Sequence, residues 1–271
     1  MLQSTGELHI AYRHDAPDAS MYAVLLRGKD ILFTAEECGG SRLPRYGTLP
    51  KPYPLLDQFD IEGTRYGVIS LPEAEGAADL LPLTLSACRS EVPLRDLYAV
   101  YTARHLASWY EANRFCGRCG AKTVSDENER MLRCPACGQM IFPKICPAVV
   151  VALRHKDRLL LTRYANRPFK NYGLVAGFVE IGETAEQTVA RECAEEVGLR
   201  VKNVRYLGSQ PWGVVGNLML GYYAEVGGPD AVTLADGELA EATWFTRETV
   251  PVRDDVSLTG DIIRRFAHGD I

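Results

Sequence analysis

The segment from Gly177 to Leu199 constrains the fold more than any other part of the chain, because it predicts a loop and a helix with defined ends. Thr184 is followed three residues later by Gln187, which is the pattern of a capping box at a helix N-terminus. Gly198 is typical of the residue that ends a helix. The segment therefore predicts a helix over residues 185–197, preceded by a loop that contains glycines.

The predicted helix carries an apolar stripe with carboxylates beside it. Val189, Cys193 and Val197 recur every four residues and should face the core. At about 100° per residue, Glu192 and Glu196 lie next to that stripe. Half-buried carboxylates placed so close together repel one another unless a cation joins them, and Mg²⁺ prefers such oxygen ligands. The alternative is an ordinary acidic helix face exposed to solvent.

The spacing of residues in this segment favours the metal-binding interpretation. Its fixed positions read Gly, five residues, Glu, seven residues, Arg-Glu, two residues, Glu-Glu, one residue and Gly. They are occupied by Gly177, Glu183, Arg191, Glu192, Glu195, Glu196 and Gly198. This pattern resembles the signature of the Nudix hydrolase family. The resemblance implies an α/β/α sandwich with a mixed sheet, a divalent-metal site on the helix and cleavage of a diphosphate.

Length and charge describe a soluble globular protein with room for more than one domain. The chain has 271 residues, which is ample for two domains. Its net charge of -5 argues against nucleic-acid binding by bulk electrostatics, although local binding is still allowed. Residues 1–12 lack the features of a signal peptide, and apolar runs such as 80–88 and 146–153 are too short to span a membrane. We therefore expect a cytoplasmic protein.

Four regions are expected along the chain. Residues 1–93 contain short β-rich runs broken by Gly and Pro, which predict a small N-terminal α/β domain. Residues 94–114 allow a linking helix that starts after Pro93. A cysteine-containing ribbon over residues 115–142 and the Nudix domain over residues 143–271 complete the chain.

Within the last region, apolar runs predict strands separated by turns. The expected strands cover residues 146–155, 158–164, 204–209, 218–226 and 242–245. A final helix is expected over residues 258–267, and residues 171–176 are expected to lead into the glutamate loop.

Four cysteines in two CxxCG motifs predict a metal site in the ribbon. They are Cys116, Cys119, Cys134 and Cys137. In a cytosolic protein such cysteines indicate thiolate ligands of one structural Zn²⁺ rather than disulfides, and the spacer between the pairs is long enough for a hairpin. A redox CxxC pair and an iron-sulfur cluster are the alternatives. The remaining cysteines are expected to be core residues or free thiols, namely Cys38, Cys88, Cys146 and Cys193.

Basic side chains surround the ribbon and permit a nucleic-acid contact. They are Arg114, Arg118, Lys122, Arg130, Arg133 and Lys144. No aromatic ladder accompanies them, so a scaffold with solvated charges is the favoured interpretation.

A second motif narrows the resemblance. Ser209, Gln210, Pro211 and Trp212 follow the glutamate helix. Together with the upstream ribbon, they resemble the NADH pyrophosphatase branch of the Nudix family. That branch implies hydrolysis of NADH or NAD⁺ to nicotinamide mononucleotide and AMP, and removal of NAD caps from RNA. It also implies zinc in the ribbon, two to three Mg²⁺ or Mn²⁺ ions at the helix, and a homodimer.

The resemblance implies roles for individual carboxylates. The metal ligands would be the backbone carbonyl of Ala176 with Glu192 and Glu196, and Glu195 would support them. Glu238 matches a further metal-linked carboxylate, and Glu241 is a close second candidate. The resemblance makes Glu192, Glu195, Glu196 and Glu238 the catalytic set. Glu195 or Glu238 would take the proton from the attacking water.

Other matched positions concern the motif and the substrate. Arg191 is expected to hold Glu183 by a charge-assisted hydrogen bond, the alternative being a surface ion pair. Phe178 matches a position that stacks on the nicotinamide ring, and Phe142 matches an aromatic that lines the dinucleotide pocket. Without the resemblance, either phenylalanine could be ordinary core.

The chain departs from the branch after Trp212. Branch members usually continue with a Pro-Phe-Pro run and then a serine, whereas this chain has glycines and valines and then Asn217. Asn217 is kept as a candidate substrate contact, and the loop should be more flexible and shaped differently. ADP-ribose or a diadenosine polyphosphate therefore stays open as the substrate. A non-catalytic Nudix protein that senses nucleotides or binds RNA is the alternative from a different functional class.

Overall fold

The computed structural model describes residues 6–35, 40–75, 80–165, 171–234, 237–252 and 256–271. The chain forms two compact units. One contains residues 145–212 and 217–271, and we call it the sandwich unit. The other contains the described residues from Gly6 to Lys144 together with residues 213–216, and we call it the ribbon unit. The predicted N-terminal region, linking helix and cysteine ribbon thus share one compact unit. Cys38 lies outside the described residues.

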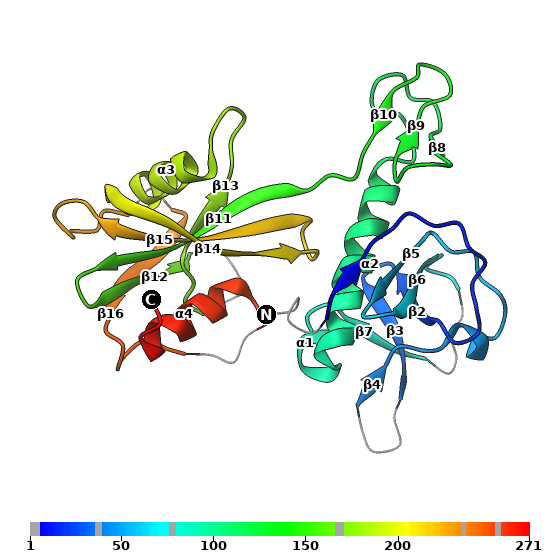
Figure 1. Ribbon diagram of the computed structural model, residues 1–271, viewed down its shortest axis with the longest axis horizontal. Coiled ribbons are helices and arrows are strands. Elements are labelled where there is room, and N and C mark those ends of the chain that lie inside the picture. The colour runs from blue at the N-terminus through cyan, green and yellow to red at the C-terminus, as the bar shows by residue number, and fades with distance from the viewer. Residues whose placement is uncertain (1–5, 36–39, 76–79, 166–170, 235–236, 253–255) are drawn as a thin grey trace. The chain divides into compact units, whose positions relative to one another are not determined.

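The sandwich unit is built on a six-stranded mixed sheet. Its strands are β11 (Cys146–His155), β12 (Arg158–Tyr164), β13 (Val175–Phe178), β14 (Val201–Trp212), β15 (Asn217–Val226) and β16 (Leu239–Phe245). The order is β14-β15-β11-β12-β16, and β13 also pairs with β11. The β11–β15 pair is parallel and the other pairs are antiparallel. Figure 1 shows α3 (Ala185–Val197) and α4 (Leu258–His268) on opposite faces of this sheet.

Alternation along β11 supplies both faces of the sheet with core residues. Val149 and Val151 pack in one apolar cluster with Val189 of α3. Val150 packs in a second cluster with Phe266 of α4. The α/β/α sandwich with a mixed sheet is therefore confirmed.

The predicted helix over residues 185–197 is confirmed at both ends. The Thr184 side chain accepts a hydrogen bond from the backbone of Gln187, and the Gln187 side chain accepts one from the backbone of Thr184. Gly198 ends the helix with a left-handed φ of 70°, a conformation that favours glycine. Residues 171–176 lead into the glutamate loop, and the last two of them begin β13, a strand that the sequence did not predict. This short strand forms through its pairing with β11.

The ribbon unit contains two sheets, and the N-terminal one has seven strands. Its strands are β1 (Leu8–His9), β2 (Tyr22–Arg27), β3 (Asp30–Ala35), β4 (Ser41–Arg42), β5 (Asp57–Ile61), β6 (Thr64–Leu71) and β7 (Leu81–Thr84). The order is β1-β5-β6-β2-β3-β4, with β7 also paired to β3. A 3₁₀ turn, Tyr46–Thr48, lies between β4 and β5. A short helix, α1 (Cys88–Glu91), follows β7.

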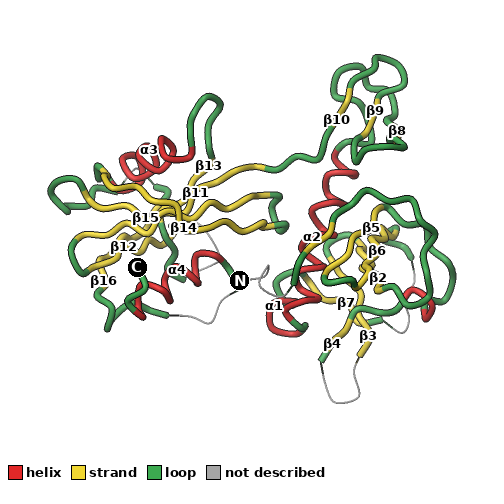
Figure 2. Tube along the Cα trace, in the orientation of Figure 1, coloured by secondary structure: helices red, strands yellow, loops and turns green. Residues whose placement is uncertain are grey.

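The predicted linking helix is α2 (Leu94–Ala112), which packs against β2, β5 and β6. Beyond its C-terminal end lies the cysteine ribbon, a three-stranded sheet (Figure 2). Its strands are β8 (Val124–Ser125), β9 (Leu132–Arg133) and β10 (Met140–Ile141). Leu132 packs with Trp109 and Tyr110 of α2 and so joins the ribbon to the helix. Among the described helices, none is both long enough and apolar enough to cross a membrane.

Candidate active site

Strand β13 and helix α3 place two buried carboxylates against a glycine. Glu192 and Glu196 are 9% and 5% exposed, so each has lost most of its contact with water. Gly177 on β13 lies directly against Glu192, and a Cβ at position 177 would be 2.0 Å from the Glu192 carboxyl carbon. Glycine is needed here for close approach. The loop and helix are thus shaped to admit the Glu192 carboxylate.

Arg191 connects the glutamates of this segment. Its Nε and Nη2 donate to the two carboxylate oxygens of Glu183 at 2.7 and 3.0 Å, a bidentate arrangement. Its Nη1 donates to Glu192 at 2.7 Å and to Glu195 at 3.0 Å. Nη2 also donates to the carbonyl oxygen of Phe178 at 2.9 Å. One guanidinium therefore ties the loop, the end of β13 and the helix together.

The electrostatics of these carboxylates differ. Hydrogen bonds from Arg191 lower the pKa of Glu183 to about 2, with help from the Thr188 hydroxyl. Burial raises the pKa of Glu192, and the nearby charges of Glu195 and Glu238 raise it further, although Arg191 opposes the shift. Glu238 is therefore close enough to act on Glu192. A cation at this point would relieve the repulsion.

The donor set fits a hard divalent cation. Buried carboxylates over a glycine, with a third and fourth carboxylate nearby, provide the oxygen ligands that Mg²⁺ and Mn²⁺ prefer. Over the described ranges, however, the four cysteines of the ribbon are the one group of three or more His, Cys, Asp or Glu side chains whose ligand atoms lie within 4.8 Å of one another. Among the described residues, no three glutamates bring their carboxylate oxygens that close together.

The two downstream candidates differ in how far their carboxylates are already engaged. Glu241 accepts hydrogen bonds from Arg163 at 2.5 Å, from Thr243 at 2.9 Å and from Tyr172. Glu238 is exposed in the turn before β16, and its backbone oxygen accepts a hydrogen bond from Ala165. Glu238 is therefore the more available carboxylate.

The candidate substrate residues fall into different environments. Gln210 is fully buried. Its side-chain Nε2 donates a hydrogen bond to the Val256 carbonyl at 2.8 Å, and its Oε1 accepts one from the Leu258 backbone N–H at 2.6 Å. It thus holds the N-terminus of α4. On β14, Ser209 and Trp212 are partly buried and Pro211 is exposed.

The other candidates lie at strand ends. Asn217 is buried opposite Trp212 at the start of β15. Phe178 in the sandwich unit and Phe142 in the ribbon unit are each 53% exposed, so neither is core. Sequence reasoning missed Thr188, which is buried and donates to Glu183 at 2.8 Å. Its position four residues after the N-cap was the available signal.

The four ribbon cysteines form a compact sulfur cluster. The Sγ atoms of Cys116 and Cys137 are 3.7 Å apart, and those of Cys119 and Cys134 are 3.4 Å apart. Backbone N–H groups that point at the sulfur lower the pKa of Cys134 to about 6. Four sulfurs at these distances fit tetrahedral Zn²⁺, and a site closed by four thiolates is structural. Outside the ribbon, the described cysteines are free thiols, as predicted.

Comparisons with known proteins agree with both sites. Residues 144–266 match the Nudix domain profile, and residues 111–142 match the NADH pyrophosphatase zinc ribbon domain. The chain is 38% identical over 183 residues to the NAD-capped RNA hydrolase NudC of Haemophilus influenzae strain PittGG, covering 66% of this chain and 68% of the relative. It is 40% identical over 149 residues to the NudC of Pseudomonas aeruginosa strain LESB58, covering 55% of this chain and 53% of that relative.

A solved structure shares the fold. The Nudix hydrolase from Nitrosomonas europaea aligns over 57% of this chain and 90% of its own, with a TM-score of 0.50 and 23% identity. The ribbon match and the cysteine cluster support a zinc ribbon, and the glutamate segment lies inside the matched Nudix domain. On this evidence, the chain belongs to the Nudix family.

Proposed function

We propose that this protein is a metal-dependent pyrophosphohydrolase that cleaves the diphosphate of NADH or NAD⁺ to nicotinamide mononucleotide and AMP. The same reaction on an NAD cap would leave RNA with a 5′-monophosphate. The observation that carries the proposal is the pair of buried glutamates, Glu192 and Glu196, beside Gly177. Relatives at 38% and 40% identity are named NAD-capped RNA hydrolases, which supports this substrate class.

The proposed metal ligands come from three elements. Two to three Mg²⁺ or Mn²⁺ ions, held by the Ala176 carbonyl with Glu192, Glu196 and Glu238, would neutralise the diphosphate and lower the pKa of a bound water. Arg191 orients Glu192 and Glu195 through its hydrogen bonds. We favour Glu238 over Glu241, because Arg163, Tyr172 and Thr243 already bond the Glu241 carboxylate.

The group that accepts the proton from the attacking water should be an exposed carboxylate with oxygen atoms not taken up by hydrogen bonds or metal. The Glu195 side chain is 61% exposed and shares one hydrogen bond with Arg191. Glu238 is also exposed. Either could accept the proton from the attacking water, whereas buried Glu196 is better suited to hold metal.

Substrate contacts are proposed at the ends of the strands. The half-exposed ring of Phe178 follows Gly177 directly and is available to stack on a nicotinamide or another base. Ser209, Pro211, Trp212 and Asn217 would line the same site, and Phe142 is kept as a candidate substrate contact of the ribbon unit. Gln210 would act indirectly, because its amide already holds α4. A homodimer and a cytoplasmic location belong to the same proposal.

Two alternatives remain candidates for the test. Another nucleoside diphosphate compound, such as ADP-ribose or a diadenosine polyphosphate, could be the substrate, because the loop after Trp212 departs from the NADH pyrophosphatase branch. A non-catalytic sensor or RNA-binding protein would be expected to have lost its metal ligands, and this chain retains them.

Product analysis over a panel of dinucleotides decides among these functions. The purified zinc-loaded protein is incubated with NADH, NAD⁺, ADP-ribose, a diadenosine polyphosphate and an NAD-capped RNA, with Mg²⁺ or Mn²⁺. We expect AMP and nicotinamide mononucleotide from NADH, and monophosphate ends from the RNA. Much faster cleavage of ADP-ribose or the diadenosine compound would overturn the substrate, and no cleavage of any member would overturn the enzyme.

A further inference from the structure

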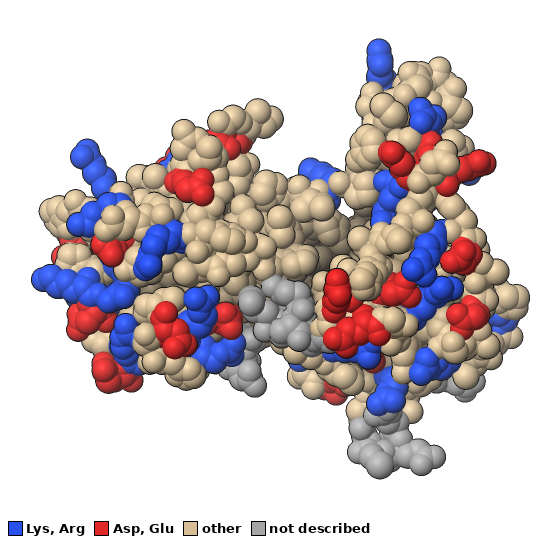
Figure 3. All heavy atoms as spheres, in the orientation of Figure 1, with Lys and Arg blue, Asp and Glu red and all other residues tan. Residues whose placement is uncertain are grey.

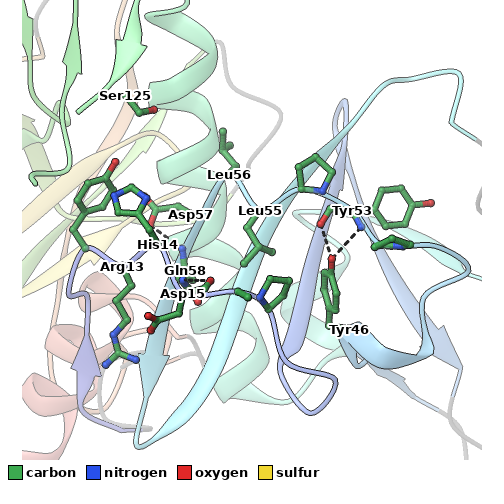
Figure 4. Close-up of a pocket in the computed structure, with 15 residues that line it drawn as sticks. Arg13, His14, Asp15, Tyr46, Tyr53, Leu55, Leu56, Asp57, Gln58 and Ser125 are labelled. Carbon is green, nitrogen blue, oxygen red and sulfur yellow. Dashed lines mark hydrogen bonds between the residues drawn. The ribbon is translucent and has the colours of Figure 1, made fainter. Parts of the chain in front are cut away.

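Two cavities adjoin in the ribbon unit. The first, of about 540 Å³, is lined by residues 12–17, by Tyr46 and by residues 52–58 (Figure 4). The second, of about 580 Å³, is lined by the end of β6, the end of α2 and the ribbon. Leu56 and Ser125 line both, so the cavities are neighbours. Each has the volume of a small-molecule site. We call the pair the ribbon groove.

The first cavity offers flat rings. Tyr12, Tyr46 and Tyr53 line it and are each partly buried. The Tyr46 hydroxyl donates to the Tyr53 carbonyl at 2.7 Å and accepts from the Tyr53 amide at 3.1 Å, which fixes the Tyr46 ring (Figure 4). Bases stack on such rings without sequence preference.

A buried amide contributes to the wall of the same cavity. The Gln58 side chain is 2% exposed, and its Nε2 donates to the Asp15 carbonyl at 3.1 Å. Its Oε1 accepts no hydrogen bond from any residue that the structure describes. The Gln58 amide therefore forms a polar part of the cavity wall.

The second cavity offers positive charge. Arg114 and Lys122 line this cavity from two neighbouring segments. A hydrogen bond joins the segments, because the Thr123 backbone N–H donates to the Arg114 carbonyl at 3.1 Å. Neither cation is ion-paired to a described residue, whereas Arg130 and Arg133 of the same ribbon are paired with aspartates. Glu111 also lines the cavity. The two unpaired cations outnumber that carboxylate and are available to a phosphate.

The unpaired cations of the groove lie in the second cavity, because Arg13, Asp15 and Asp57 of the first cavity each have an ion-pair partner. On the face that Figure 3 shows, acidic and basic side chains are interspersed rather than gathered into one basic surface. A ligand would therefore be held by a few defined contacts, and rings and phosphates would be needed together.

We propose that the ribbon groove binds a single-stranded RNA segment, with a base against the tyrosines and a phosphate at Arg114 and Lys122. The proposal rests on the proposed function, because a capped RNA has a chain beyond its cap and a free dinucleotide does not. Adjacent ring and phosphate sites match the alternation of base and phosphate along a strand. The rings that the ribbon sequence lacks are supplied by the N-terminal residues.

Binding of an uncapped RNA isolates the groove from the catalytic site. The probe is a fluorescein-labelled single strand of about ten nucleotides, the range covered by small single-strand-binding folds. Fluorescence anisotropy is measured with the full zinc-loaded chain over a range of salt. In the double variant Arg114→Ala/Lys122→Ala we expect about tenfold weaker binding. The slope of log K against log salt should also become shallower by about 0.7, because contact with one phosphate is lost.

Two further variants make the test specific. Arg118→Ala removes an exposed ribbon cation that lines neither cavity and should bind RNA like the wild type. Ser125→Trp fills the point where the cavities meet, and it should weaken binding without changing charge. NADH turnover should be unchanged in all three variants.

Defined results would overturn the proposal. Wild-type binding by the double variant, or an equal loss in Arg118→Ala, would remove the groove as the site. If AMP alone showed the same charge-dependent binding, the occupant would be a free nucleotide and not RNA. Hydrolysis of NADH by the wild type is measured beside these assays. Its failure would sink the proposed function, whereas intact hydrolysis with no effect on RNA binding would sink only the groove.

Discussion

Replacing Arg130 with methionine should destabilise the ribbon unit strongly, because it breaks a buried ion pair between the cysteine ribbon and the N-terminal sheet. Arg130 Nε and Nη2 donate to the two oxygens of Asp57 at 2.8 and 3.0 Å. The Asp57 side chain is 0% exposed and that of Arg130 is 13% exposed. In the variant, the Asp57 carboxylate would still accept hydrogen bonds from the Tyr110 hydroxyl at 3.1 Å and from the Gln58 backbone N–H at 2.7 Å. It would have lost the cation that pairs with it.

The magnitude follows from the burial of this pair. Removing one partner of a buried ion pair costs about 3–5 kcal/mol, because the other charge is left desolvated and unpaired. For a unit of this size, each kcal/mol lowers Tm by about 2–4 °C. Arg130→Met should therefore lower Tm of the ribbon unit by roughly 6–20 °C.

Calorimetric unfolding with zinc present measures this effect. Arg133→Met is the matched control, because the Arg133 side chain is 44% exposed and its pair with Asp126 should contribute about 1 kcal/mol or less. The double variant Asp57→Leu/Arg130→Met should recover part of the loss, since no buried charge remains. An Arg130→Met protein as stable as Arg133→Met would refute the reasoning.

Three further predictions concern the site and the ribbon. Gly177→Ala would place a Cβ 2.0 Å from the carboxyl carbon of Glu192 and so displace that carboxylate. We expect kcat for NADH to fall by about 100-fold, while the near-UV circular dichroism spectrum stays that of the wild type. A kcat equal to that of the wild type would contradict the close packing. The ion pair of Glu183 with Arg191 lowers the pKa of Glu183 to about 2 from an ordinary 4.5, so its stabilisation is present above pH 4.5 and is lost as the pH falls through about 2. Urea unfolding of wild type and Glu183→Gln should accordingly converge across that window, and a constant difference would argue against the pair. Cys134→Ser should remove zinc, as measured by metal analysis, and lower Tm of the ribbon unit; a variant that keeps one zinc per chain would refute the four-cysteine site.

Local signals in the sequence were sufficient for the glutamate helix and the cysteine ribbon. The bounds of α3 are set by a capping box, a left-handed glycine and a four-residue apolar repeat, all of which lie within one segment. Likewise, the paired CxxC motifs bring the four sulfurs together through two short turns and one hairpin.

Features that depend on distant partners could not be predicted. Strand β13 has four residues, and its glycine gives no apolar alternation, so it is visible only through its pairing with β11. Gln210 is identified as a cap of α4 only by partners 46 and 48 residues away. The buried pair of Asp57 and Arg130 spans 73 residues, and nothing near either residue indicates it.

The most direct test of the central claim is the metal-dependent release of AMP from NADH by Glu196→Gln. This substitution preserves the size of a buried side chain that is 5% exposed and removes the charge proposed to hold the metal. We predict that Mg²⁺- and Mn²⁺-dependent turnover is abolished while unfolding and zinc content match the wild type. Turnover equal to that of the wild type would contradict the assignment of the glutamate helix as the catalytic metal site.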